Sequence, residues 1–278
     1  MSLTIGSSIS YRIASNITKY YNKLGANISH ISSGLRASGP GEDIVTLSAS
    51  NMIKSDISVL SQGIRNANDG MSLLQVADGA SQVIGIMLIR LKELAEQAST
   101  GTYSDDLRKI IDEEFQQIMQ EISLTANSCE FNSIKILNDD NISIKIHYGM
   151  ENSDLKDYLH IRGQDFTAAG LKIDTLSVLL QDDAQKALED IDKAIITVNE
   201  NRAHFGALIN RLEEITLTQG GNIELIYGHS SAIGDTDIAN EFTDLTTNTV
   251  KAQTALAALS KANMTPHKAL SILSGQNG

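Results

Sequence analysis

The sequence predicts a mainly α protein in which long antiparallel helices form a coiled-coil or bundle rod that carries a small β-hairpin region. Apolar residues recur every three or four positions over most of the 278 residues, which is typical of helices. Only a segment at about 133–177 alternates apolar and polar residues, as short strands do. The chain has two prolines, no Trp and 4% aromatic residues, so slender helix-on-helix contacts are favoured over a thick globular core.

The first and last parts of the chain each carry a helical stripe of apolar residues. Ser, Asn and Thr separate the apolar residues of the first 35 positions, and because these are mediocre helix formers, that helix needs a packing partner. A second stripe, with alternating intervals of four and three residues, begins at Ile238 and runs toward the C terminus. We therefore expect the two terminal stripes to pack on each other.

A break separates the first stripe from a much longer helix. The stretch HISSGLRASGPGED contains residues that permit unusual backbone angles or lack an amide donor, namely Gly34, Gly39, Pro40 and Gly41. This segment is predicted to redirect the chain. We expect Asp43 or a neighbour to cap the helix that follows.

The long helix is predicted from Ile57 to Ala98, on the order of 60 Å at its usual rise per residue. Its stripe changes phase once, between Leu74 and Ala77. A periodic run of this length without proline is typical of a coiled coil or a bundle rod. A turn at residues 99–106 then leads into a further striped helix.

Four alternating stretches follow at about 133–177, and we expect them to form short antiparallel strands or hairpins. They are SIKIL, SIKIHYG, YLHIRG and LKIDTLSV. Helical spacing resumes from Ala184 to Ile215. The sequence TQGGN at 218–222 should weaken this helix locally, since a glycine in a helix interior costs roughly 1 kcal/mol against alanine.

Composition argues against several classes of partner. The formal net charge of -12 and the absence of a basic run oppose binding to nucleic acid or to an anionic membrane. The N terminus lacks the pattern of a secretory signal, and we see no stretch of about 18 apolar residues that would predict a membrane span. With Cys129 as the only cysteine, an internal disulfide and a cysteine metal cluster are excluded.

No motif predicts an enzyme or a cofactor. The six histidines are far apart and lack metal-ligand spacing, and the glycine-rich pieces match neither a phosphate loop nor a dinucleotide fingerprint. Carboxylate pairs such as Asp105/Asp106 stand near helix starts, where negative charge is favourable. Cys129 is better explained as a small buried side chain than as a reactive thiol.

Several blocks in register resemble bacterial flagellin. They are HISSGLRAS, RNANDGMSLLQVADGASQVI, RLKELAEQAS, ANSCEFNSIKIL, NRAHFGALINRLE, IGDTDIANEF and NMTPHKALSIL. The resemblance covers roughly residues 1–138 and 184–273, in the family's order. Because only residues 139–183 separate the two halves, the chain looks like a minimal flagellin without the variable outer domains.

The resemblance implies a layered subunit of a helical filament. Residues 1–35 and 240–278 would pair in an inner coiled-coil layer, residues 36–46 would form a spoke, and residues 47–239 would form an outer rod. The inner contacts between subunits would come from the terminal stripes, at Ile5, Ile9, Ile13, Ile17, Leu24, Ile28, Ile31, Leu245, Leu256 and Leu259. An intramolecular bundle that uses the same residues is the alternative.

The family's biology supplies further expectations. Flagellins pass unfolded through the flagellar export channel and add beneath a distal cap, so the implied partners are other copies of the chain, an export chaperone, the filament cap and hook-junction proteins. The chain is then expected to be secreted into an extracellular flagellum that serves motility.

Two surface features remain to be assigned. Positions that resemble the flagellin surface recognised by a vertebrate Toll-like receptor are Arg90, Glu93, Leu94, Gln97 and Glu114, although charged residues on one helix are commonly a solvated face. An Asn-x-Ser site in the hairpin region offers Asn141 or Ser143 for glycosylation.

Two alternatives to a filament subunit stay open. A hook-filament junction protein shares the terminal architecture but adds only a thin ring. A soluble helical adaptor or chaperone would bind partners without polymerising, and it predicts ordered termini in the monomer where the filament hypothesis predicts mobile ones.

Overall fold

The computed structural model describes residues 2–37, 39, 41–151, 153 and 157–273, with side chains between residues 8 and 264. Its elements, in chain order, are α1 (Ser2–Ser33), α2 (Ile44–Ser99), α3 (Asp105–Ser128), β1 (Glu130–Phe131), β2 (Ile134–Lys135), β3 (Ser143–His147), β4 (Tyr158–Arg162), α4 (Gln181–Gly234) and α5 (Ile238–Leu273). The mainly α fold with a small β region is confirmed. The chain folds into two compact units, Met1–Ser55 with Ile226–Gly278, and Asp56–Leu225.

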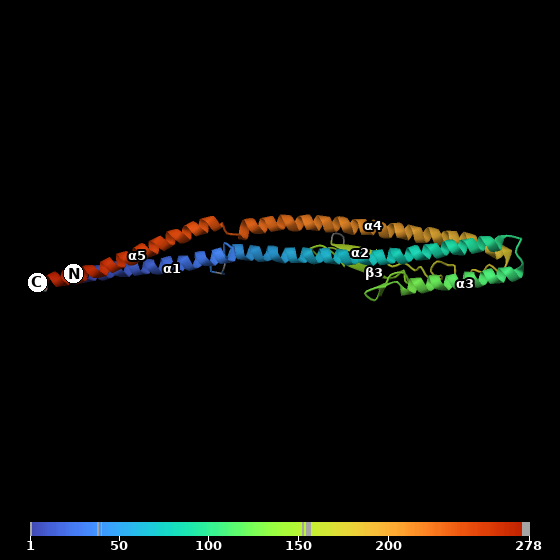
Figure 1. Cartoon of the computed structure of the whole chain (residues 1–278), viewed down its shortest axis with the longest axis horizontal. Coiled ribbons are helices and arrows are strands. Elements are labelled where there is room, and N and C mark those ends of the chain that lie inside the picture. Colours follow the sequence, from blue (N-terminus) through green and yellow to red (C-terminus); the bar gives the residue numbers. More distant parts are fainter. Residues whose placement is uncertain (1, 38, 40, 152, 154–156, 274–278) are drawn as a thin grey trace. The chain divides into compact units, whose positions relative to one another are not determined.

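In the first unit, α1 and α5 pack side by side (Figure 1). The Ser10 hydroxyl donates to Asn263 Oδ1 over 3.0 Å near one end of the pair, and Asn248 Nδ2 donates to Asn27 Oδ1 over 3.1 Å near the other. Low residue numbers in α1 therefore face high numbers in α5, so the two helices are antiparallel. The terminal stripes do pack on each other, as the spacing predicts.

In the second unit, α2 presents an uninterrupted heptad face to the core. The buried positions recur every seven residues in two registers, at Leu60, Ala67, Leu74, Ser81, Leu88 and Ala95, and at Gly63, Gly70, Ala77, Ile84, Leu91 and Ala98. The predicted phase change is wrong, because Ser81, Gly63 and Gly70 hold core positions without being apolar. Ser81 meets its hydrogen-bonding need by donating to the Ala77 carbonyl over 2.6 Å.

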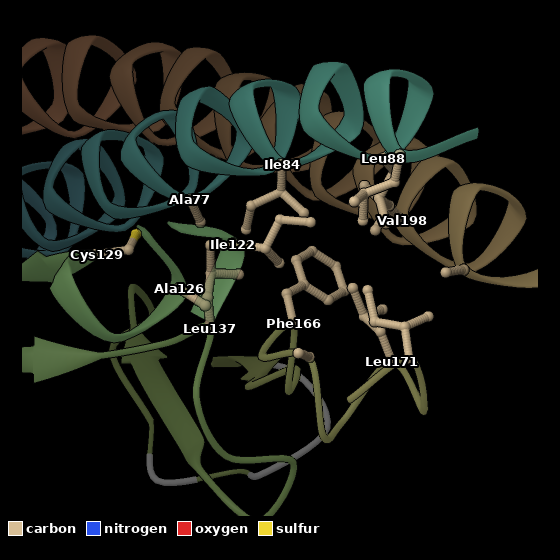
Figure 2. Close-up of a cluster of buried hydrophobic side chains, with 14 of the residues drawn as sticks. Ala77, Ile84, Leu88, Ile122, Ala126, Cys129, Leu137, Phe166, Leu171 and Val198 are labelled. Atoms are coloured by element: carbon tan, nitrogen blue, oxygen red, sulfur yellow. The ribbon is translucent and has the colours of Figure 1, made fainter. Parts of the chain in front are cut away.

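Side chains from both the helices and the connecting loops form the core of this unit. Figure 2 shows Ile84 and Leu88 of α2 and Val198 of α4 on one side, with Phe166 and Leu171 of the connecting loops on the other. These side chains, together with Ile122 and Phe115 of α3, are buried in one continuous cluster. The loops between α3 and α4 therefore complete the core, so they are part of the folded unit and not a loose insertion.

Two antiparallel hairpins lie between α3 and α4. The first joins β1 to β2 through Asn132 and Ser133, whose φ angles of 49° and 64° are those of a tight two-residue hairpin turn. The second pairs Ser143 with Arg162 and His147 with Tyr158. Its alternate residues, which include Leu159 and Ile161, are buried against the helices.

Two glycines of α2 create the space on which the second hairpin rests. A Cβ atom added at Gly63 would stand 2.4 Å from the backbone oxygen of Tyr148, and one added at Gly70 would stand 3.1 Å from Ile146 Cγ1. Beside them, Asn66 Nδ2 donates to the His147 carbonyl over 2.8 Å. The hairpin backbone thus lies directly on the helix.

One local expectation is wrong. The stretch LKIDTLSV is not a strand: the Leu171 amide donates to the Thr167 carbonyl and the Ile173 amide to the Ala168 carbonyl, which folds the backbone into turns. Its alternation arises because side chains such as Ile173 and Val178 fill the core. The TQGGN sequence lies within α4, which is helical from Gln181 to Gly234, and local weakening there stays a prediction.

Candidate assembly site

The paired terminal helices cover their apolar stripes only in part. Of the predicted contact residues, Ile13, Ile17, Leu24, Ile31, Leu245 and Leu259 are partly buried. Ile9, Ile28 and Leu256 remain 47%, 58% and 43% exposed. The Ile5 side chain lies outside the described residues. A single chain therefore leaves much of this stripe open to water.

Further apolar side chains on the same unit are exposed and were not among the predicted contact residues. Tyr11 is 78% exposed, Phe242 58% and Val250 57%. Val250 also lines an open groove of about 350 Å³ between α1 and α5, together with Ile13 and Tyr20. Phe242 lies on the predicted C-terminal stripe, four residues after Ile238, whereas only the structure identifies Tyr11 and Val250 as part of a wide apolar surface.

The breaks between helices face each other in this unit. Gly34 ends α1 with φ of +71°, and its amide donates to the His30 carbonyl over 2.8 Å, the geometry of a glycine helix cap. The Arg36 amide donates to the Gly234 carbonyl over 2.8 Å, and the Thr236 amide donates to the Gly34 carbonyl over 2.9 Å. The two breaks are thus hydrogen-bonded to each other in one joint.

Two of the other three predicted hinge residues, Gly39 and Gly41, lie in the described part of the chain. Gly39 accepts a hydrogen bond from the Glu42 amide over 3.2 Å, and Gly41 lies in the turn before α2. Pro40 lies outside the described residues. Of the four, only Gly34 has a described backbone conformation that favours glycine.

Asp43 immediately precedes α2 and caps its N terminus. The Thr46 amide donates to Asp43 Oδ1 over 3.0 Å, and the Thr46 hydroxyl donates to Oδ2 over 2.7 Å. Arg36 Nη2 also donates to Oδ2, over 2.9 Å. These bonds, first the one from the Thr46 amide, hold the pKa of the Asp43 carboxyl below its ordinary value.

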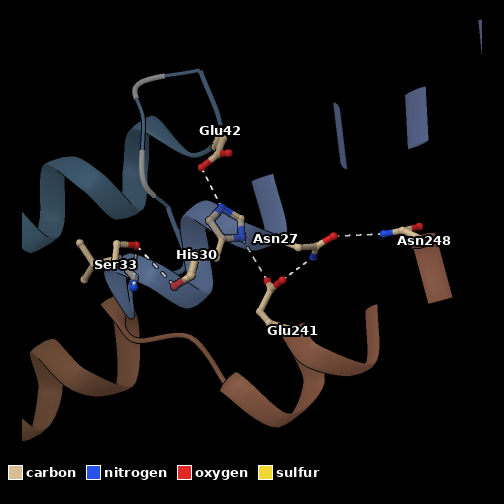
Figure 3. A network of polar contacts seen from close by, with 7 residues as sticks. Asn27, His30, Ser33, Glu42, Glu241 and Asn248 are labelled. Atoms are coloured by element: carbon tan, nitrogen blue, oxygen red, sulfur yellow. Dashed lines mark hydrogen bonds and ion pairs between the residues drawn. The ribbon is translucent and has the colours of Figure 1, made fainter. Parts of the chain in front are cut away.

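A partly buried polar network connects the joint to the helix pair. Figure 3 shows the His30 ring between Glu42, which precedes α2, and Glu241 of α5. The Nε2 atom lies 3.0 Å from Glu42 Oε2, and Nδ1 lies 3.1 Å from Glu241 Oε1. Asn27 donates to the other Glu241 oxygen and accepts from Asn248. Neither the network nor the role of His30 was predicted from the sequence.

Four of the predicted receptor-facing residues are exposed and one is buried. Arg90 Nη2 donates to Glu114 Oε1 over 2.7 Å, and Arg90 Nη1 donates to Glu93 Oε2 over 3.0 Å, so these three side chains meet on the exterior. Gln97 is also exposed, and its Nε2 donates to the Tyr103 hydroxyl over 3.2 Å. Leu94 is 2% exposed and belongs to the core, so its assignment to an exposed surface is wrong.

The remaining candidate residues have structural surroundings. Asn141 and Ser143 are exposed, and the Asn141 amide donates to Asp139 Oδ1 over 2.8 Å. Cys129 is buried, and this burial raises the pKa of its thiol. Within the part of the chain that the structure describes, no group of three or more His, Cys, Asp or Glu side chains could hold a metal ion.

One helix among the described residues is long and apolar enough to cross a membrane by length and composition alone. It is α2, in which an 18-residue window has a mean hydropathy of 1.4 and is 33% buried. This differs from the expectation that no such stretch exists. The core helix of a soluble protein meets the same criterion, and the heptad face of α2 accounts for its buried apolar residues.

Both halves of the chain match family models. Residues 7–142 match the bacterial flagellin N-terminal helical region, and residues 188–273 match the bacterial flagellin C-terminal helical region. Among solved structures, the fold is similar to Bacillus cereus flagellin, with a TM-score of 0.50 and 29% identity over 56% of this chain and 88% of that one. A putative flagellar hook-associated protein from Vibrio parahaemolyticus shares the fold, with a TM-score of 0.58 at 10% identity over 70% of this chain and 100% of that one.

Curated relatives extend the match along the chain. A flagellin from Halalkalibacterium halodurans is 31% identical over 87% of this chain and 89% of its own length. The flagellar filament 31.3 kDa core protein of Treponema maltophilum is 32% identical over 87% of this chain and 90% of its own. Flagellin FlaB2 of Treponema pallidum is 31% identical over 89% and 91%. The two family models and these relatives establish that the chain belongs to the bacterial flagellin family.

Proposed function

We propose that this chain is a structural subunit that polymerises into the filament of a bacterial flagellum and so serves motility. The observation that carries the proposal is the exposed apolar surface of the α1–α5 pair, where Tyr11, Ile28, Phe242 and Val250 are each more than half exposed. Relatives named as flagellar filament core proteins match most of the chain. The proposed location of the assembled protein is accordingly an extracellular flagellum.

The driving force is burial of this surface between copies. Fully burying one large apolar side chain contributes about 1.5–3 kcal/mol, so several half-exposed side chains on each copy supply a substantial part of an association energy. Different faces of the α1–α5 pair must meet in neighbouring copies, because a head-to-tail contact is what extends a helical polymer. Folding of the terminal helices is then coupled to assembly.

The proposal has finer parts that the family resemblance supports. Residues 1–35 and 240–278 form the inner layer of the filament, residues 36–46 the spoke and residues 47–239 the outer rod. The chain is exported unfolded through the flagellar channel with the help of an export chaperone, and it adds beneath a filament cap after hook-junction proteins. A chain with one cysteine and two prolines has no disulfide and few slow prolyl bonds to hinder that passage.

Two rival functions make different predictions. A hook-filament junction protein forms a ring of limited size, and the similarity to the Vibrio parahaemolyticus structure concerns the fold alone. A helical adaptor forms discrete particles whose terminal helices are ordered in the monomer. Unlimited growth from a seed distinguishes the filament subunit from both.

The deciding experiment is electron microscopy of purified protein after seeding with short filament fragments. The full-length chain should form long hollow filaments, whereas chains lacking residues 1–35 or 240–278 should not. A sharper pair of variants is Ile28→Asp and Asn22→Asp, which place the same negative charge on α1 at an exposed apolar and an exposed polar position. Loss of growth with the first alone supports the proposal, and discrete particles insensitive to both truncations would refute it.

Recognition by a vertebrate Toll-like receptor is a second proposed function, and it rests on the exposed cluster of Arg90, Glu93 and Glu114. A receptor reporter assay with Arg90→Ala, against Lys109→Ala on α3 as a control, tests it. Equal signals from both variants would remove the proposal. Glycosylation at Asn141 or Ser143 is tested separately by the mass of the hairpin peptide from native filaments.

A further inference from the structure

Two asparagines occupy covered positions in the contact between α1 and α5. A series of covered positions, with intervals of four and three residues, runs through residues 13–31 of α1 and through residues 245–259 of α5. Asn27 belongs to the first series and Asn248 to the second, and each residue is only 8% exposed. A layer of polar side chains therefore interrupts a mostly apolar helix contact.

The side chains of this layer satisfy one another (Figure 3). Asn248 Nδ2 donates to Asn27 Oδ1 over 3.1 Å, and Asn27 Nδ2 donates to the Glu241 carboxylate. The Glu241 side chain is 18% exposed. Among the described residues, no buried side-chain nitrogen or oxygen lacks a hydrogen-bond partner. The bonds of both asparagines thus depend on how α1 and α5 are aligned.

A polar layer of this kind costs stability and adds discrimination. Leucine at both positions would pack in the contact without the desolvation of two amides, so the layer is not the most stable choice. An amide that is buried without a partner, however, strongly disfavours any alignment that leaves it so. One polar residue at a core position can fix the register of a coiled coil for this reason.

The apolar positions alone leave the register open. A shift of seven residues preserves the four-three spacing, so that apolar positions of the two helices still meet. In one direction the shift brings Asn27 level with Ala255 and Asn248 level with Gly34, and neither of these partners has a polar side-chain atom. The opposite shift leaves Asn27 level with Glu241. The polar layer therefore discriminates mainly against the first shift.

We propose that Asn27 and Asn248 are specificity-determining residues that fix the register in which α1 pairs with α5 during filament assembly. The joint between the helix breaks holds the register only where both helices belong to one chain. A filament brings together the terminal helices of many copies, and between copies the polar layer acts where the joint cannot. This inference rests on the proposed function and deepens it.

Disulfide trapping in filaments of the full-length chain, with Cys129→Ala as the background, measures the register. The pair Ser10→Cys/Asn263→Cys reports the native register, because the Ser10 hydroxyl donates to Asn263 Oδ1 over 3.0 Å. The pair Ile17→Cys/Asn263→Cys reports the shifted register. Ile17 lies about 10 Å from Ser10 along the helix, and a disulfide requires Cα atoms within about 7 Å of each other. Peptide mass spectrometry measures both disulfides, within a chain or between chains.

Each reporter pair is combined with three sets of substitutions. Asn27→Leu/Asn248→Leu removes both amides of the layer. Asn27→Leu alone removes the acceptor of the Asn248 amide and leaves that amide buried. Asn22→Leu/Gln253→Leu adds the same two leucines at exposed positions of α1 and α5 and is the matched control.

The ratio of shifted to native disulfide should rise at least about fivefold in Asn27→Leu/Asn248→Leu and stay unchanged in the control. Filaments of this double variant should nevertheless melt at a higher temperature than those of Asn27→Leu, which retains an amide without its acceptor. A disulfide ratio equal to that of the control, or equal melting temperatures of the single and double variants, would overturn the inference. If the unaltered chain forms no filament, the proposed function fails instead, and the same ratio measured on the monomer decides the role of the layer.

Discussion

Replacing Gly63 by Ala should destabilise the unit Asp56–Leu225, whereas replacing Gly79 by Ala in the same helix should stabilise it. A Cβ atom at Gly63 would stand 2.4 Å from the Tyr148 oxygen and 2.9 Å from its carbonyl carbon. Both are backbone atoms of the hairpin that rests on α2, so no side chain can rotate away. Gly79 has no atom within 4 Å of its added Cβ.

The magnitude follows from two opposing effects. Alanine is favoured over glycine in a helix interior by about 1 kcal/mol, and both variants gain this. Forcing an extra methyl group into a packed contact costs about 1–3 kcal/mol, and only Gly63→Ala incurs it. The helix gain cancels in the comparison, so the two variants should differ by about 1–3 kcal/mol, or roughly 2–12 °C in Tm for a unit of this size.

Urea and thermal unfolding of the monomeric chain, followed by circular dichroism, would measure the difference. The Asp56–Leu225 unit should be less stable in Gly63→Ala, and more stable in Gly79→Ala, than in the unaltered chain. The Asn66–His147 contact should be weakened in the first variant alone. If Gly63→Ala is as stable as Gly79→Ala, the hairpin does not lie on the helix at this point, and the stated packing is wrong.

Three further predictions concern other parts of the molecule. The raised pKa of His30 means that its stabilisation of the α1–α5 pair is complete below its unfolded value of 6.5 and is lost as the pH rises through the folded pKa, so filament melting temperatures should fall over that range in the unaltered chain but not in His30→Gln. Leu88→Ala, at a fully buried position, should cost about 2–5 kcal/mol in urea unfolding, against little change for Ile86→Ala, which is 60% exposed. Asp43→Ala removes the α2 cap at a cost of about 1 kcal/mol, and faster hydrogen exchange at the Thr46 amide should reveal it.

The architecture could be predicted from the sequence because the spacing of apolar residues reflects which face of each helix is buried. The stripe around Ile13 and Leu24 correctly implied a partner helix, and the stripe that includes Leu245 supplied it. The prediction that the glycine-rich segment ends the first helix was also correct, because Gly34 has the left-handed conformation that is common at helix ends. These features are local in sequence, which is why one chain sufficed to find them.

Features that depend on contacts between distant residues could not be found in this way. Gly63 and Ser81 hold core positions, although neither counts as apolar in a stripe. The alternation around Ile173 was mistaken for a strand, because side-chain burial alternates there while the backbone bonds locally. His30 has an ordinary sequence setting, and its role requires Glu241, which lies more than two hundred residues away in the chain.

Hydrogen exchange of residues 8–33 and 238–264, compared between the monomer and the assembled filament, tests the central claim most directly. We expect strong protection of both segments in the filament and rapid exchange in the monomer, because the exposed apolar faces of α1 and α5 are covered only by other copies. The heptad face of α2 from Leu60 to Ala98 should be equally protected in both states. Terminal segments as protected in the monomer as in the filament would contradict assembly through these helices.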